Sequence, residues 1–138
     1  MIGLDTNVLA RYYVASDEPA TQGQREAAMA LLESGKPLFV SKTVVQELEW
    51  LLRGFYKSPP RDVLAVLEHL KALPNMQLED RPAIDMAVAA LAQGFDFADA
   101  LHHASSRQCS HMATFDDKRF ARNAAAARWK PAVKLLSM

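Results

Sequence analysis

The sequence contains one cysteine, no long apolar run and no excess of charge of either sign. A single thiol, Cys109, cannot form an internal disulfide, which favours a reducing compartment, and we interpret it as a small buried hydrophobe. No apolar stretch approaches the roughly 20 residues that span a bilayer. The first residues carry no basic segment followed by an apolar one, as a signal peptide would. We therefore expect a cytoplasmic protein that does not associate with membranes.

Several catalytic and nucleotide-binding motifs are also missing. The chain has no Gly-x-Ser-x-Gly turn, no P-loop and no Gly-x-Gly-x-x-Gly loop, and Cys109 has no evident relay partner. The 16 basic residues balance the 16 acidic residues, which argues against indiscriminate binding of nucleic acid. These absences leave no support for a serine or cysteine nucleophile.

The patterning that is present predicts a single α/β domain over residues 1–138. Short apolar runs alternate with amphipathic stretches, which is typical of a central, mostly parallel sheet of about five short strands flanked by helices. The predicted strands are Ile2–Leu4, Leu38–Val40, Met76–Leu78, His111–Phe115 and Val133–Leu136. The predicted helices cover residues 5–14, 21–34, 43–56, 59–73, 83–93, 98–108 and 118–127, with Gly35 as a left-handed cap.

Three aspartates share one structural context. Asp5 and Asp116 each follow a predicted strand and precede a helix, and Asp99 lies in the first turn of a helix. The carboxyl ends of parallel strands meet at one edge of a sheet, where such folds bind ligands. Aspartate is also a favoured N-cap, and Asp96 has the spacing of an N-cap to Asp99. Taken singly, each aspartate is better explained as a cap; taken together, they indicate a site.

Glu47 is the fourth acid of interest. It falls on the predicted apolar stripe of its helix, three residues after Val44, and no basic residue lies three or four positions away. Glu49, by contrast, precedes Arg53 by four residues and is interpreted as an ordinary solvated pair. An unpaired acid beside a core face is costly unless a metal or another group compensates its charge. In a cluster of four acids we expect one raised pKa, and Glu47 is the candidate.

Four carboxylates without a cysteine–histidine pattern favour magnesium or manganese over zinc. The chemistry that uses such a site is phosphodiester hydrolysis by activated water, which needs no protein nucleophile. From Lys118 onward the chain holds six basic residues and no acid, namely Lys118, Arg119, Arg122, Arg128, Lys130 and Lys134. This run is either a solvated surface or a place for phosphate contacts.

Four segments resemble the ordered motifs of PIN-domain proteins. They are Leu4–Leu9, Ser41–Glu47, Phe97–His102 and Thr114–Asp116, and they span essentially the whole chain in order. The size and the first motif look most like the VapC-type toxins of bacterial toxin–antitoxin pairs.

The resemblance implies a Mg²⁺- or Mn²⁺-dependent endoribonuclease that forms a homodimer and is inhibited by a small antitoxin whose C-terminal segment crosses the acidic pocket. It implies that Asp5, Glu47, Asp99 and Asp116 are the catalytic and metal-binding acids. Thr6, Asn7 and Thr114 match positions that support such a site by hydrogen bonds. Asp117 is either a further acid or the N-cap of the next helix. His103 lies four residues after Asp99 and is placed to contact it, whereas His102 is interpreted as local structure.

Two other functions stay open. A phosphatase-like enzyme with a nucleophilic aspartate would use Asp5, although the acid usual two positions later is replaced by Asn7. A non-catalytic metal- or RNA-binding α/β module would hold the same acids without cleaving anything. The RNA target, the number of metal ions and the roles of His102 and His103 are not decided by the residues.

Overall fold

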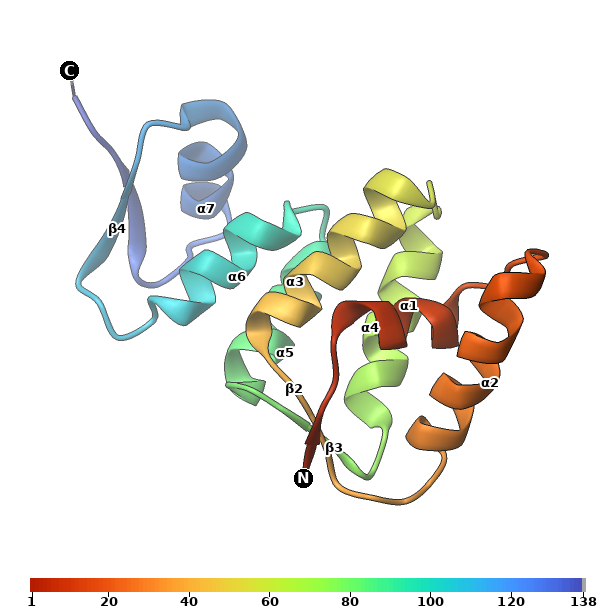
Figure 1. Ribbon diagram of the computed structural model, residues 1–138. Helices are drawn as coiled ribbons and strands as arrows, with labels where there is room; N and C mark the ends of the chain where they lie inside the picture. The colour runs from red at the N-terminus through yellow and green to blue at the C-terminus, as the bar shows by residue number, and fades with distance from the viewer. Residues whose placement is uncertain (138) are drawn as a thin grey trace. The chain divides into compact units, whose positions relative to one another are not determined.

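The computed structural model describes residues 1–137 and divides them into two compact units. Unit 1 is Met1–Arg81, and unit 2 begins at Pro82. Each unit has its own parallel strands and its own buried side chains, and each is described by itself (Figure 1).

Unit 1 is built on a three-stranded parallel sheet. Its strands are β1 (Ile2–Gly3), β2 (Leu38–Val40) and β3 (Met76–Leu78), in the order β1-β2-β3. Leu38 is paired with Ile2 on one side and with Met76 on the other, so β2 is the central strand. Leu38 and Val40 are fully buried, as expected for a strand covered on both faces.

Helices of unit 1 supply the rest of its core. They are α1 (Thr6–Tyr13), α2 (Pro19–Leu32), α3 (Lys42–Trp50) and α4 (Pro60–Ala72), and α3 continues into a π-helical segment, η1 (Leu51–Phe55). Two residues, Leu4 and Asp5, separate β1 from α1, so the helix starts at the carboxyl end of the strand (Figure 1). The most fully buried leucines of these helices are Leu9, Leu48, Leu52, Leu67 and Leu70.

Unit 2 combines four helical segments with a pair of parallel strands. The elements are α5 (Arg81–Ala92), α6 (Phe97–Ser105), β4 (His111–Thr114), η2 (Asp117–Ala121), α7 (Arg122–Ala126) and β5 (Ala132–Leu135). Strand β4 pairs with β5 from His111 opposite Ala132 to Thr114 opposite Leu135. Ile84, Val88, Phe97, Leu101 and Phe120 form its buried apolar centre.

The predicted α/β class and the five short strands are confirmed, each strand within about one residue of its expected position. All strand pairs are parallel, and their hydrogen bonds form one sheet of three strands and one of two. Whether residues 1–138 behave as a single domain stays a prediction. In the described part of the chain, no helix has the length and apolar character needed to cross a membrane.

One expectation about the core is wrong. Cys109 is exposed instead of buried. It lies in the turn between α6 and β4, where its backbone N–H donates to the Ser106 carbonyl at 2.9 Å. The turn keeps the thiol away from the apolar centre of unit 2, and this arrangement is not evident from the apolar character of the residue.

Two glycines allow a test of the backbone. Gly35 follows α2 with φ of +78°, which L-residues adopt at a cost, whereas Gly23 lies inside the exposed part of α2. We expect Gly35→Ala to lower the free energy of unfolding by about 1 kcal/mol. Gly23→Ala is expected to raise it by about 0.5–1 kcal/mol, because alanine favours helix. Urea unfolding of both variants measures this, and shifts of the same sign would contradict it.

Candidate acidic site

Unit 1 places Asp5 and Glu47 on either side of Thr6. Asp5 follows β1 and caps α1, and its carboxylate accepts a hydrogen bond from the Thr6 backbone N–H at 2.8 Å. The Thr6 hydroxyl donates to Oε1 of Glu47. Thr6 is only 2% exposed, so its position is set by packing. One buried residue therefore joins two of the predicted acids, as the support role proposed for Thr6 requires.

Glu47 reaches this position because the buried face of α3 differs from the predicted stripe. The buried residues of this helix and η1 are Val45, Leu48, Glu49 and Leu52, which have the spacing of one helix face. Glu47 lies outside that face and is exposed. The prediction that Glu47 lies on the core stripe was therefore wrong, and the cost of burying an unpaired acid does not apply to it.

The acid that α3 does bury is Glu49. It is 3% exposed and accepts a hydrogen bond from Nε of Arg53 at 2.8 Å. The pairing was expected, but Glu49 is not solvated as the sequence suggested. Arg53, one turn away, compensates the charge of Glu49, so this carboxylate can lie on the apolar face of α3. The prediction of the buried stripe did not allow for a buried acid.

Unit 2 brings Asp99 under the electrostatic influence of Asp116. Asp96 caps α6 by accepting from the Asp99 backbone N–H at 3.0 Å, as its spacing predicted. Partial burial raises the pKa of Asp99, and the negative charges of Asp96 and then Asp116 raise it further. His102 acts in the opposite direction. The sequence pointed to Glu47 for a raised pKa, whereas the structure gives one for Asp99.

Asp116 is held by the turn that follows β4. Its backbone N–H donates to the Thr114 hydroxyl at 3.0 Å, and its carboxylate accepts from the Arg119 backbone N–H at 3.0 Å. Asp116 is thus the N-cap of η2, and the interpretation of Asp117 as that cap is wrong. Asp117 instead pairs with Arg122, with 2.8 Å between carboxylate and guanidinium. Whether Asp117 is a further site acid stays a prediction.

The two histidines of α6 lie in different surroundings. His102 is exposed and lowers the pKa of Asp99. His103 is 3% exposed, and its Nε2–H donates to the Pro131 carbonyl at 2.7 Å. The expected contact of His103 with Asp99 is therefore replaced by a structural contact with the chain that leads into β5.

The donor chemistry fits a hard divalent cation. Each unit supplies carboxylate oxygens of two predicted acids, and oxygen ligands are those that magnesium and manganese prefer. Neither unit by itself, within residues 1–137, brings together three His, Cys, Asp or Glu side chains that could hold a metal ion. Asn7 is exposed at the start of α1, and its supporting role stays a prediction.

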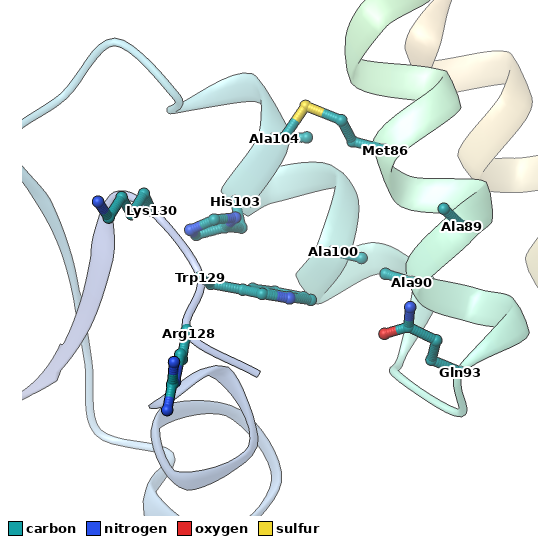
Figure 2. Close-up of a pocket in the computed structure, with 10 residues that line it drawn as sticks. All are labelled: Met86, Ala89, Ala90, Gln93, Ala100, His103, Ala104, Arg128, Trp129 and Lys130. Atoms are coloured by element: carbon teal, nitrogen blue, oxygen red, sulfur yellow. The ribbon is translucent and has the colours of Figure 1, made fainter. Parts of the chain in front are cut away.

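Sequence reasoning missed two features near these acids. The influence of Asp96 on Asp99 could have been found from their spacing of three residues in the first turn of a helix. The second feature is the packing of Trp129 against His103 (Figure 2). The available signal was the position of Trp129 between Arg128 and Lys130 in the basic C-terminal run. Neither feature contributes to the four family-like motifs.

Comparison with known families identifies the chain. The family model of the PIN domain matches residues 2–126. The chain therefore belongs to the PIN-domain family, whose members are generally metal-dependent nucleases acting on RNA. A search of curated proteins found no significant match.

The raised pKa of Asp99 predicts how the metal-free chain responds to pH. The folded chain retains the Asp99 proton to a higher pH than the unfolded chain, so ionisation costs stability as the pH rises above about 3.8. Asp99→Asn should therefore melt higher than the unsubstituted chain at pH 7 in chelator. The gain should be below about 1 kcal/mol, because solvent screens a partly exposed group.

The advantage of Asp99→Asn should disappear as the pH falls below about 3.8, where both states are protonated. Asp17→Asn, at an exposed position before α2, is the matched control for the substitution itself. Thermal melts across this pH range measure both variants. An Asp99→Asn melting point equal to that of the unsubstituted chain at pH 7 would contradict the electrostatic argument.

Proposed function

We propose that this protein is an endoribonuclease that hydrolyses RNA phosphodiesters with Mg²⁺ or Mn²⁺ as its cofactor. The observation that carries the proposal is the coupling of Asp99 with Asp116 in unit 2, in a chain of the PIN-domain family. An acid whose pKa is raised by burial and by neighbouring acids is a feature of functional sites. The hydrogen-bonded set of Asp5, Thr6 and Glu47 in unit 1 adds support.

In this proposal Asp5, Glu47, Asp99 and Asp116 hold the cation. When bound, such an ion lowers the pKa of its bound water toward neutrality and stabilises charge on the reacting phosphate. The protein's own contribution is positioning. Thr6 orients Glu47 through its hydroxyl, and Thr114 fixes the backbone of Asp116.

The pKa of Asp99 is raised by its partial burial and by the charges of Asp96 and Asp116, while His102 acts in the opposite direction. Asp99 is therefore assigned to cation binding, which would relieve the repulsion that it experiences from these acids.

We further propose that the chain is the toxin of a toxin–antitoxin pair, acting in the cytoplasm as a homodimer. The resemblance to VapC-type toxins supports this, and so do Trp50 and Phe55, which are 56% and 68% exposed on unit 1. Large exposed apolar side chains are frequent at protein interfaces. A small antitoxin that inserts an arginine or lysine among the acids would block the site, because a cation satisfies their charge.

The nuclease proposal predicts the ends of the products. Purified protein should cut single-stranded RNA with Mg²⁺ or Mn²⁺ and stop in chelator, leaving 5′-phosphate and 3′-hydroxyl ends because water attacks. Asp99→Asn and Asp116→Asn should each reduce the cleavage rate by at least about 100-fold, since loss of a direct ligand should cost as much as loss of its support. Asp62→Asn, an exposed acid of α4, is the matched control.

End-group analysis of labelled RNA measures this outcome. Cyclic phosphate ends, or cleavage that persists in chelator, would contradict the mechanism. Cation binding without any cleavage would instead favour a metal- or RNA-binding module. A trapped aspartyl-phosphate would favour a phosphatase-like enzyme.

The toxin proposal has its own test. Induced expression of the chain should arrest bacterial growth, and Asp116→Asn should abolish the arrest while the protein accumulates to the same level. Co-expression of a short reading frame adjacent to this gene should restore growth if it encodes the antitoxin. An inhibitor that binds while leaving the acids accessible to metal would contradict inhibition by an inserted basic side chain.

A further inference from the structure

Unit 1 contains a pocket of about 250 Å³ that includes none of the four acids. It is lined by the end of α1, the loop that follows, the first two turns of α2 and the end of η1. Figure 1 shows α1 beside α2, the two helices that supply most of the lining. The volume lies below the range of about 300–1,000 Å³ that is usual for small-ligand sites. The pocket therefore suits a single chemical group better than a whole cofactor.

Arg11 of α1 lines this pocket and is held by two neutral acceptors. Its Nε donates to Oε1 of Gln24 at 2.7 Å, and its Nη1 donates to the Tyr56 hydroxyl at 3.3 Å. In the described part of the chain Arg11 forms no ion pair with an acid, whereas Arg53 is paired with Glu49. The Arg11 guanidinium is therefore fixed in place while its charge stays available to an anion.

A second guanidinium, that of Arg25 on α2, lines the same pocket. Arg25 is half-buried, as Arg11 is, and among residues 1–137 it has no acidic partner. Glu18 is the one acid among the described residues of the lining. It is exposed at the start of α2 and pairs with neither arginine. The lining thus carries two positive charges and one negative charge, which favours an anionic ligand.

Hydroxyl groups add neutral donors to the two arginines. The Ser16 hydroxyl accepts from the Glu18 backbone N–H at 3.2 Å, and the Tyr56 hydroxyl accepts from Arg11. Within the described residues neither hydroxyl donates to a protein acceptor, so each keeps its proton for an acceptor in the pocket. Charged and neutral donors from three segments therefore line one cavity, and such a set suits the oxygens of an oxyanion.

We propose that this pocket binds a phosphate group of the RNA backbone, and this proposal rests on the proposed nuclease function. Arginine binds phosphate oxygens through paired N–H groups. The pocket also lies near the acids of unit 1. Helix α1 begins at Thr6, which contacts Asp5 and Glu47, and Arg11 follows five residues later, about 7.5 Å farther along the helix axis. An RNA strand at the acids would therefore reach the pocket with a phosphate a few nucleotides away.

The first measurement is binding of inorganic phosphate to the full chain in chelator, so that no metal bridges phosphate to the acids. Phosphate is titrated at constant ionic strength and followed by the NMR signals of the arginine Nε–H groups. Saturable shifts are expected for Arg11 and Arg25. Arg25→Gln should weaken phosphate binding by at least about fivefold, because it removes a charge-assisted contact. No acidic partner is stranded by this change, so the fold should be kept, which a thermal melt checks.

A substitution of opposite sign tests the electrostatic argument. Glu18→Gln should strengthen phosphate binding by about two- to fivefold, because it removes the negative charge of the lining. Glu26→Gln, at an exposed position of α2 outside the lining, is its matched control. Arg61→Gln, at an exposed position of α4, is the matched control for Arg25→Gln. Both controls should bind phosphate as the unsubstituted chain does.

The second measurement distinguishes RNA from other sources of an oxyanion. Single-stranded RNA hexamers without terminal phosphates are bound in chelator at several salt concentrations. Arg25→Gln should weaken uridine and adenosine hexamers equally, because a phosphate contact does not read the base. It should also reduce the slope of log affinity against log salt by about 0.7, the value for one contact to a single strand.

Unsaturable phosphate shifts, or Arg25→Gln that binds phosphate as Arg61→Gln does, would overturn the phosphate site. Hexamer affinity that does not depend on Arg25 would overturn the assignment to RNA, and acetate bound as tightly as phosphate would then indicate a carboxylate of a protein partner. The result is separable from the nuclease test. Unchanged hexamer affinity with intact RNA cleavage would reject the subsite alone. Hexamer binding that depends on Arg25, without cleavage of RNA in Mg²⁺, would reject the nuclease activity and support the subsite.

Discussion

Three of the four acids of the proposed site are positioned by hydrogen bonds from neutral donors, and this constraint governs the structure around them. Asp5 and Asp116 each accept a bond from the backbone at the start of a helical segment, and Glu47 accepts one from Thr6. In the part of the chain that the structure describes, none of these three forms an ion pair with a basic side chain. Backbone N–H groups at a helix start stabilise a carboxylate without neutralising it. The charges therefore stay available to a cation.

Other acids of the same chain are treated differently. Glu49 is bound by Arg53, and Asp117 is bound by Arg122. Both lie within two residues of a proposed site acid in the sequence, yet each has a guanidinium partner. A carboxylate paired with arginine is a poor ligand, since the ion pair must break before a metal can bind. The distinction between neutral donors and cationic partners separates structural acids from candidate ligands better than burial does.

The sequence predicted the strands well because β-strand signals here are local. Each strand is a short apolar run bounded by turn residues. The aspartates that follow β1 and β4 are read directly as helix caps. The face of α3 was harder, because Glu49 occupies a buried position that only its contact with Arg53 makes tolerable. The spacing of four residues predicted this pair, but the burial of Glu49 depends on how α3 packs, and periodicity alone assigned the wrong acid to the core.

Dependence on the folded structure also explains why the raised pKa of Asp99 and the packing of Trp129 were not predicted. The raised pKa of Asp99 depends on its burial and on Asp116, seventeen positions away in the sequence, and no local pattern reports that proximity. Trp129 is similar, because its packing on His103 and Phe95 joins three segments that are separate in the sequence. Helix caps and strands can therefore be predicted from the sequence, whereas the electrostatic influence of distant acids and the packing of aromatic rings are seen only in the folded structure.

Unit 2 consequently combines two requirements with opposite electrostatic demands. Partial burial and the charges of Asp96 and Asp116 raise the pKa of Asp99, so a cation that binds there would stabilise the folded chain by its affinity for that state. RNA, in contrast, is repelled by the same acids and needs positive charge nearby. Arg128 and Lys130, two exposed cations of the segment before β5, lie in the same unit. An anionic substrate would therefore meet attractive and repulsive charges on different segments of the chain.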